Sequence, residues 1–278
     1  MEQKKEGIAK VDIEATLKSK NPKLYKRLPR FVINYIKRVT HEKDINEFLA
    51  VHGHKHDFEF LEAVIAYFNI TLNVIGEENI RKSPGGIIYA SNHPIGSIDG
   101  MALMHVLGKH RKDLKFIVND ILMAVKNLEG LFVGVNKHGK TNNLAREIDA
   151  LYGSDQSILV FPAGLVSRKQ KGVVRDLEWK KSFISKAKKF QRDIIPVYTH
   201  GRNSKKFYNL GVWRKRLGIK ANIEMFFLID EMFKQKDKTL TFVFGKPIPY
   251  TYFDKSHNDL EWAQIIKQQV YDLEKQIQ

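Results

Sequence analysis

The chain has 278 residues, no cysteine and a formal net charge of +16 at pH 7. The lack of cysteine excludes a disulfide framework, a thiolate metal site and a cysteine nucleophile. Hydrophobic residues make up 43% of the sequence, with 17 Phe and 10 Tyr, so most of the chain can fold around a large core and intrinsic disorder is excluded for it.

Apolar residues recur at spacings of three and four from residue 21 to about residue 75, which predicts helices there. Beyond Pro84, short apolar runs bounded by Gly or Pro predict strands at 86–90, 116–118, 131–135, 158–161, 194–198 and 240–244. Helical spacing returns at 100–107, 142–152, 179–190 and 259–277. This alternation predicts an α/β fold, a mixed sheet with covering helices, preceded by an N-terminal helical region. We place the boundary between residues 1–80 and 81–278.

The segment YASNHPIGSIDG at 89–100 carries the most chemical information. A predicted strand runs there into a polar turn with His93 and Asp99, and a helix follows. On one helix these two residues would lie about 120° apart, so their pairing requires the turn that Pro94 and Gly96 supply. A histidine oriented by a carboxylate can take a proton from a substrate hydroxyl. The structural alternative is that His93 caps a turn and Asp99 caps the helix.

Three more blocks follow in order: GLFVGVNKHG at 130–139, FPAGLVSRK at 161–169 and IIPVYTHGRNS at 194–204. Together with NHPIGSIDG they resemble the glycerolipid acyltransferase superfamily of the lysophosphatidate acyltransferase type, and more closely its bacterial hemolysin-like branch. The resemblance covers about residues 84–250. It implies transfer of a fatty acyl group from acyl-CoA or acyl carrier protein to a hydroxyl of a lysolipid acceptor. It implies no metal and no bound cofactor.

The resemblance also implies a role for individual residues. His93 would be the general base and Asp99 its orienting carboxylate. The acceptor-binding residues would be Asn136, Lys137, Phe161, Pro162, Ala163, Gly164, Ser167 and Arg168. The supporting residues would be Asn92, Gly96, Pro196 and Arg202.

Two features depart from the family pattern. Five residues separate His93 from Asp99, where the family has four, and Ala163 replaces the glutamate of the FPEG block. The longer spacing affects only the turn. The missing glutamate bears on the acceptor, because that block helps to hold it. An acyl-amino-acid lysolipid is therefore as plausible an acceptor as a lysophosphatidate-like lipid.

A competing interpretation involves nucleotides. Residues 134–141 read GVNKHGKT, which fits the phosphate-binding pattern G-x-x-x-x-G-K-[ST]. Residues 226–231, FFLIDE, imitate a strand that ends in a Mg²⁺-binding acid. Bulky side chains at 136–138 oppose close wrapping around phosphate. We therefore keep a nucleotide hydrolase, and a non-catalytic protein that binds anionic lipid, as alternatives.

A histidine-rich segment, HGHKHD at 52–57, offers metal-ligand side chains. It follows a predicted helix, and the order of its His and Asp residues reverses the common hydrolase pattern. We expect an exposed turn between helices at this place.

The positive charge lies in two segments. Residues 164–220 hold 17 Lys or Arg against three Asp or Glu, and residues 15–41 hold eight Lys or Arg and no acid. In both, aromatic and aliphatic residues alternate with the cations, which suits an anionic bilayer, coenzyme phosphates or an acidic acyl carrier protein. A merely solvated face is the alternative. We expect no nucleic-acid partner, because no recognition motif accompanies the charge.

The sequence predicts peripheral rather than integral membrane contact. The apolar run at 223–233 is interrupted by Glu224, Asp230 and Glu231, whereas a spanning helix needs about 20 apolar residues. The N-terminal segment MEQKKEGIAKVDIEATLKSK lacks the apolar region of a signal peptide. We therefore expect a cytoplasmic protein that is peripheral on the inner face of the cell membrane.

Overall fold

The structure is a computed structural model that describes residues 10–20, 22–81, 85–96, 98–119, 123, 125–135, 141–219 and 223–277. Its centre is a seven-stranded sheet in the order β1-β9-β8-β2-β5-β3-β4. The strands are β1 (Thr71–Ile75), β2 (Ile88–Ser91), β3 (Leu114–Asn119), β4 (Phe132–Val135), β5 (Ser157–Val160), β8 (Ile194–His200) and β9 (Thr239–Phe244). Every neighbouring pair is parallel except β8 and β9. The sheet is therefore mixed, as predicted.

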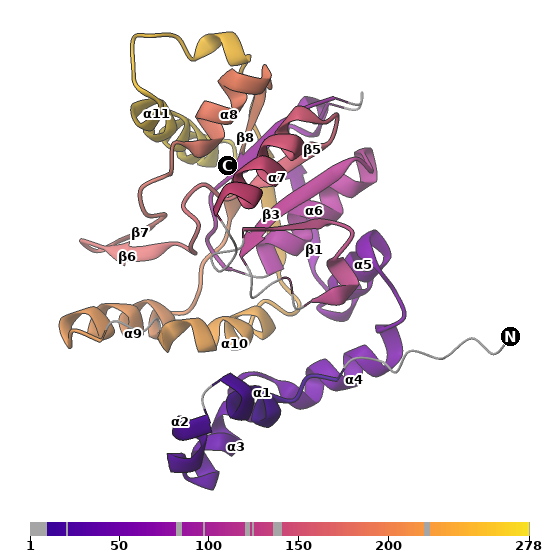
Figure 1. Cartoon of the computed structure of the whole chain (residues 1–278), viewed down its shortest axis with the longest axis vertical. Coiled ribbons are helices and arrows are strands. Elements are labelled where there is room, and N and C mark those ends of the chain that lie inside the picture. Colours follow the sequence, from indigo (N-terminus) through magenta and orange to yellow (C-terminus); the bar gives the residue numbers. More distant parts are fainter. Residues whose placement is uncertain are drawn as a thin grey trace, which may run out of the picture.

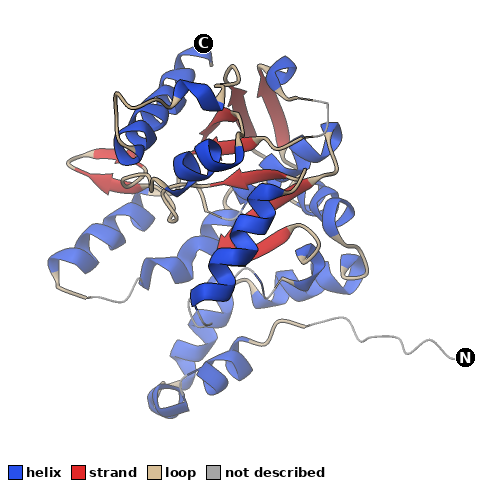
Figure 2. Cartoon of the chain, turned by 45° about the horizontal axis from the view of Figure 1, so that its top comes forward, coloured by secondary structure: helices blue, strands red, loops and turns tan. Residues whose placement is uncertain are grey.

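Helices cover both faces of this sheet (Figure 2). The N-terminal helices are α1 (Ile13–Lys20), α2 (Pro22–Arg27), α3 (Arg30–Val39), α4 (Glu42–His52) and α5 (Asp57–Tyr67). The helices further along the chain are α6 (Ile98–His110), α7 (Thr141–Gly153), α8 (Ser182–Phe190), α9 (Lys205–Arg216), α10 (Leu228–Phe233) and α11 (Asp259–Asp272). Short 3₁₀ turns occur at Glu77–Asn79, Lys126–Leu128, Ile223–Phe227, Tyr250–Tyr252 and Leu273–Gln276.

Alternation along the strands divides the core into two layers. In β2, Tyr89 packs with the side chains of α5 and α6, whereas Ile88 and Ala90 pack with those of α7, α8 and α11. Successive side chains of a strand point to opposite faces, and a parallel strand covered on both faces is apolar throughout. All four residues of β2 are buried. This burial fixes the strand whose end carries the His93 turn.

The six predicted strands and the four predicted C-terminal helices are all present, but β1 and the helices α1, α9 and α10 were missed. Residues 71–75 continue the helical spacing of the preceding residues, yet they form an edge strand that pairs in parallel with β9. An edge strand is only half buried, as the burial of β1 shows, so its pattern is weak. The predicted boundary at residue 80 stays a prediction, although β1 joins the large sheet from its N-terminal side.

A small antiparallel hairpin of β6 (Arg168–Gln170) and β7 (Val173–Arg175) was also missed. Lys171 and Gly172 form its turn, with φ of 48° and 88°. Two residues with positive φ are the requirement of the two-residue turn whose twist matches that of antiparallel strands. The hairpin projects from the body of the molecule beside α9 (Figure 1).

Helices α1–α4 extend away from the sheet (Figure 1). His41, between α3 and α4, stacks on Phe233 of α10 with ring centroids 3.8 Å apart. Its Nδ1 lies 3.0 Å from a carboxylate oxygen of Asp44, and its Nε2 lies 3.3 Å from one of Asp230. These contacts attach the N-terminal helices to α10. Among the described residues, no helix has the length and apolarity needed to cross a membrane.

A first prediction concerns α11, whose N-terminus has a capping box: the Asn258 side chain accepts from the amides of Leu260 and Glu261. Asn258→Ala should lower the free energy of unfolding by about 1 kcal/mol, because both amides lose this acceptor. Urea denaturation measures it. Asn209→Ala, an exposed asparagine within α9, is the matched control and should not destabilise the protein. Equal stability of Asn258→Ala and wild type would contradict the capping role.

Candidate active site

Three of the four sequence blocks meet at one edge of the sheet. Strands β8, β2 and β5 are adjacent and parallel, so their carboxyl ends lie together. Ligands of open α/β sheets bind in the crevice outside these ends. His93 follows β2, Phe161 follows β5 and Arg202 follows β8. The topology therefore gathers the residues that the sequence had separated by more than a hundred positions.

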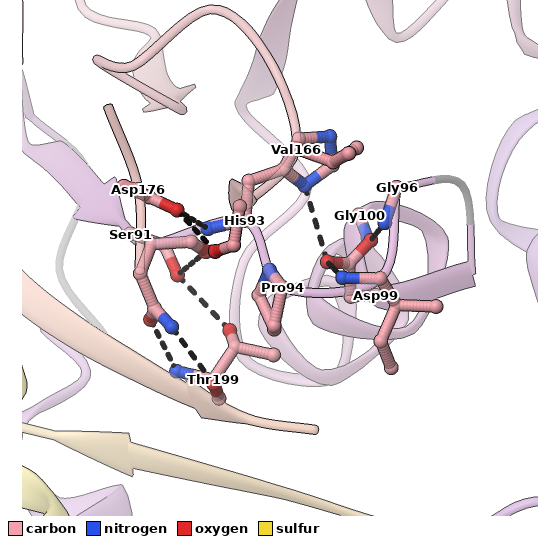
Figure 3. A network of polar contacts seen from close by, with 12 residues as sticks. Ser91, His93, Pro94, Gly96, Asp99, Gly100, Val166, Asp176 and Thr199 are labelled. Atoms are coloured by element: carbon pink, nitrogen blue, oxygen red, sulfur yellow. Dashed lines mark hydrogen bonds and ion pairs between the residues drawn. The ribbon is translucent and has the colours of Figure 1, made fainter. Parts of the chain in front are cut away.

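The predicted pairing of His93 with Asp99 is present. Nδ1 of His93 lies 3.1 Å from Oδ2 of Asp99, and Figure 3 shows the turn that joins them. Asp99 is fully buried in the first turn of α6, whereas the His93 side chain keeps 14% of its surface exposed. The carboxylate thus orients the ring from the protein interior, and the ring retains access to solvent.

Backbone amides complete the surroundings of Asp99. Its oxygens accept from the amides of Ile95 at 3.0 Å, Gly96 at 3.1 Å and Gly100 at 2.9 Å. Burial alone would raise the pKa of Asp99, but His93 and the amides of Ile95 and Gly96 outweigh it, so this pKa lies below its ordinary value. An ionised Asp99 favours the tautomer of His93 that carries its proton on Nδ1.

The ring of His93 is held on a second side by the FPAG block. Phe161 stacks on it with ring centroids 4.0 Å apart and an interplanar angle of 16°. Phe161 in turn meets Phe116 edge-on at 5.3 Å. Within the described chain, no residue hydrogen-bonds Nε2 of His93. In the favoured tautomer that nitrogen holds a lone pair available to a substrate proton.

Asp176 is a site residue that sequence reasoning missed. Its Oδ1 accepts from the Ser167 hydroxyl at 2.6 Å and from the His93 amide at 3.2 Å, and its Oδ2 accepts from Nε1 of Trp179 at 2.9 Å. The Ser167 amide donates to the carbonyl of His93 at 2.8 Å, which closes a ring of hydrogen bonds. Figure 3 shows Asp99 and Asp176 on opposite sides of His93. The carboxylate of Asp99 orients the side chain of His93, and the carboxylate of Asp176 holds its backbone.

Burial of Asp176 raises its pKa, an effect that its hydrogen bonds only partly offset. Its sequence neighbourhood, VVRDLEW, gave no signal for a functional acid, because an acid beside arginine is usually exposed. Ser167, which the resemblance made an acceptor ligand, is buried and committed to Asp176.

The predicted supporting residues hold the turn in place. The side chain of Asn92 accepts from the amide of Thr199 at 2.7 Å and donates to its carbonyl at 2.9 Å, so it extends the pairing of β2 with β8. Gly96 has φ of 122°, and a Cβ there would lie 3.0 Å from both Val166 and Leu228. Only glycine suits that position. Pro196 lies in β8 opposite Ala90, and Arg202 is exposed after β8.

Asn203 also supports the turn and was not predicted. It is buried, and its side chain donates to the carbonyl of Ile95 at 2.9 Å. Its backbone amide donates to the Tyr208 hydroxyl at 3.0 Å, which links the turn to α9. The signal was present in the fourth block, THGRNS, where an asparagine directly follows the exposed arginine.

The FPAG residues form a tight turn rather than a row of ligands. The amide of Gly164 donates to the carbonyl of Phe161 at 2.9 Å, and Gly164 has φ of 67°. Pro162 and Ala163 are buried, and the Pro162 carbonyl accepts from the amide of Lys180. Phe161 thus contacts His93, whereas Pro162, Ala163 and Gly164 form the turn that holds it.

Arg168 is the predicted acceptor ligand that the structure places least favourably. It is buried over the ring of Phe207, and its Nη2 lies 3.5 Å from Oε1 of Glu224. The other oxygen of Glu224 pairs with Nε of Arg214 at 2.8 Å. Two arginines therefore share one buried carboxylate beneath the β6–β7 hairpin, and the charge of Arg168 is engaged within the protein.

Asn136 and Lys137 lie outside the described residues, as do residues 138–140 of the phosphate-loop pattern. The second half of the nucleotide interpretation is wrong: residues 226–231 form a 3₁₀ turn and α10 instead of a strand. Asp230 pairs there with Lys234, and Glu231 accepts from Ser204. Leu228, Ile229, Met232 and Phe233 have helical spacing, which explains the difference.

The histidine-rich segment is the predicted turn between helices, running from the end of α4 to the start of α5. The side chain of Asn127 donates to the carbonyls of Gly53 and Lys55 in this turn. In the part of the chain that the structure describes, no three His, Cys, Asp or Glu side chains come together as a metal site.

The lowered pKa of Asp99 generates a second prediction. Because its pKa is lower folded than unfolded, the ionised carboxylate stabilises the fold above the unfolded value near 3.8, and this contribution disappears as the pH falls through the folded value. Asp99→Asn should therefore lower the free energy of unfolding by about 1–3 kcal/mol at neutral pH, and the difference should shrink below about pH 4.

Urea denaturation between pH 7 and pH 3 measures this difference. Asp155→Asn, which changes an exposed carboxylate, is the matched control and should stay within about 0.5 kcal/mol of wild type. A difference between Asp99→Asn and wild type that grows as the pH falls would contradict the assignment.

Comparison with known proteins places this geometry in a family. The sequence matches the acyltransferase family over residues 15–278. A lyso-glycine lipid O-acyltransferase of Bacteroides thetaiotaomicron is 46% identical over 265 residues, which cover 95% of this chain and 97% of that protein. A protein of the same name from Phocaeicola vulgatus is 43% identical over 270 residues, which cover 96% of each chain.

Among solved structures, the 1-acyl-sn-glycerophosphate acyltransferase PlsC of Thermotoga maritima matches with a TM-score of 0.49 and 17% identity, over 88% of this chain and 92% of that one. The family match spans nearly the whole chain, and both relatives are well above 30% identity over nearly their full length. The chain therefore belongs to the acyltransferase family.

Proposed function

We propose that this acyltransferase moves a fatty acyl group from acyl-CoA or acyl carrier protein to a hydroxyl of a lyso-glycine lipid. The His93–Asp99 pair carries the proposal, because a buried, ionised carboxylate orients a histidine whose Nε2 has no partner among the described residues. The names of the two relatives support the acceptor class. Of the two acceptor classes that the sequence left open, they favour the acyl-amino-acid lipid.

In the proposed mechanism His93 acts twice. Its Nε2 takes the proton of the acceptor hydroxyl as the hydroxyl oxygen attacks the thioester carbonyl, and Asp99 stabilises the imidazolium that forms. The tetrahedral intermediate then collapses with cleavage of the carbon–sulfur bond. The departing thiolate receives the proton from Nε2, which restores the neutral ring. Oxygen replaces sulfur on the acyl carbon, so no enzyme thiol or hydroxyl is acylated.

The proposal includes a peripheral position on an anionic membrane. Large apolar side chains are exposed among the cations of both basic segments: Phe31 and Tyr35 on α3, and Trp213 and Leu217 at the end of α9. Side chains of this type enter the interfacial region of a bilayer while neighbouring Lys and Arg reach the headgroups. Such a position would bring the lysolipid acceptor to the enzyme without extraction into water.

The mechanism predicts that His93→Ala lowers kcat/KM by about 10²–10⁴-fold, because the general base is lost. Asp99→Asn should cost a comparable factor, because an amide no longer favours the reactive tautomer. Mass spectrometry of the product, with lyso-glycine lipid as acceptor and acyl-CoA or acyl carrier protein as donor, measures both. His54→Ala, in the exposed turn between α4 and α5, is the matched control and should transfer normally.

Undiminished acyl transfer by a folded His93→Ala protein would contradict the mechanism. Lysophosphatidate, assayed in parallel, tests the acceptor. Transfer to lysophosphatidate but none to lyso-glycine lipid would contradict the acceptor assignment and leave the mechanism standing.

The membrane position predicts salt-sensitive binding to vesicles. Wild type should sediment with vesicles of phosphatidylglycerol and phosphatidylcholine at about 0.1 M salt and be released toward 1 M, as the screening length falls from about 10 Å to about 3 Å. Trp213→Ser should weaken binding about tenfold, because its side chain, 62% exposed, loses the apolar contact. Pure phosphatidylcholine vesicles are the control. Failure to bind anionic vesicles at low salt would refute this part of the proposal.

A further inference from the structure

The β6–β7 hairpin has an unusual surface for a protein segment in water. Residues 168–175 contain four Lys or Arg and no acid. Val174 packs against Val166, Phe207 and Tyr208, whereas Val173, on the opposite face, is 57% exposed at the end of the turn. Lys171 in the turn and Lys169 on the neighbouring strand are exposed too. An apolar side chain is thus presented to the outside within a group of cations.

The hairpin continues the exposed apolar and cationic end of α9. Strand β6 packs on α9 through Arg168, whose guanidinium lies 5.4 Å from the centre of the Phe207 ring. Figures 1 and 2 both show the hairpin and α9 projecting from the same side of the molecule. Trp213 and Leu217 are exposed near the C-terminal end of α9, and the exposed Lys215 and Arg216 lie between them.

The two ends of the hairpin reach the candidate catalytic base. Ser167 precedes β6 and Asp176 follows β7, and they are joined by the 2.6 Å hydrogen bond between their side chains. Ser167 donates its amide to the carbonyl of His93, and Asp176 accepts the amide of His93. The eight residues of the hairpin therefore connect Ser167 and Asp176, which both hydrogen-bond the backbone of His93.

We propose that the β6–β7 hairpin is a lipid-contact element, which inserts Val173 into the surface of an anionic bilayer and so sets His93 at a fixed height above the acceptor. The consequence for His93 rests on the proposed acyltransferase function; the lipid contact does not. Charge complementarity favours anionic lipid, because the exposed Lys169 and Lys171 lie on the same short hairpin as Val173, and residues 168–175 contain no acid. A membrane also accounts for the position of the hairpin and α9, which carry the exposed Val173 and Trp213 and project from the same side of the molecule.

The absence of cysteine allows a site-specific probe. Val173→Cys, labelled with the environment-sensitive dye acrylodan, should show a blue-shifted emission when vesicles of phosphatidylglycerol and phosphatidylcholine are added, because the dye leaves water. Val51→Cys is the matched control: Val51 is 63% exposed on α4, and its label should not shift. Val173→Asp should weaken vesicle binding about tenfold more than Val51→Asp does.

Equal emission of the label at Val173 with and without vesicles would overturn the inference, whether or not the protein sediments with them. A shift that requires acyl carrier protein instead of vesicles would also overturn it, in favour of a protein partner. Acyl transfer by wild type, combined with no shift of the label on Val173→Cys, would refute the lipid contact of the hairpin and leave the proposed function standing. A shift of the label on Val173→Cys, combined with no acyl transfer by wild type, would refute the proposed function and leave the lipid contact standing.

Discussion

The candidate site depends on the burial of one charged carboxylate. Asp99 is fully buried, and an unpaired charge there would cost far more than any single contact returns. Its two oxygens are therefore met by the ring of His93 and by the amides of Ile95, Gly96 and Gly100. These donors require the backbone to fold back between β2 and α6. The same requirement that makes the carboxylate tolerable in the core thus determines where the ring of His93 points.

Sequence periodicity predicted most of the fold because most elements are long or fully buried. Strands such as β2 and β8 are buried on both faces and read as continuous apolar runs. Helices α1, α9 and α10 were missed as well as strands β1, β6 and β7, and the missed strands have a pattern that is hard to recognise. Strand β1 is a half-buried edge, and each strand of the β6–β7 hairpin has three residues, too few for alternation to be recognised. The apolar residues of β1 continue the spacing of three and four found in the preceding helices. The sequence therefore shows no sign of where the helices end and the strand begins.

The site was predictable to the extent that its residues are close in sequence. His93 and Asp99 lie six positions apart, and the pairing could be inferred from one turn. Asp176 is 83 positions from His93, and its importance arises only when β7 brings it to the backbone amide of His93. Arg168 shows the reverse case, since the resemblance made it an acceptor ligand, whereas burial beside Glu224 engages its charge internally. Resemblance to the sequence blocks of a family identifies residues that lie near the site. The hydrogen bonds of the folded protein then distinguish the residues that face the substrate from those that are engaged within the protein.

The cations of the basic segment at residues 164–220 also divide into those engaged within the protein and those free to meet a partner. Part of its charge stabilises the interior: Arg192 donates to backbone carbonyls of Tyr152 and Gln156, and Arg168 and Arg214 share Glu224. The three lysines of α8 pair with Asp149 and Asp259, so the charge left for a partner is concentrated on the hairpin and on the end of α9. Of these, only the hairpin is bounded at both ends by groups bonded to the backbone of His93. A force on its exposed turn would therefore act on the candidate base through two hydrogen bonds to the backbone of His93, without passing through the sheet.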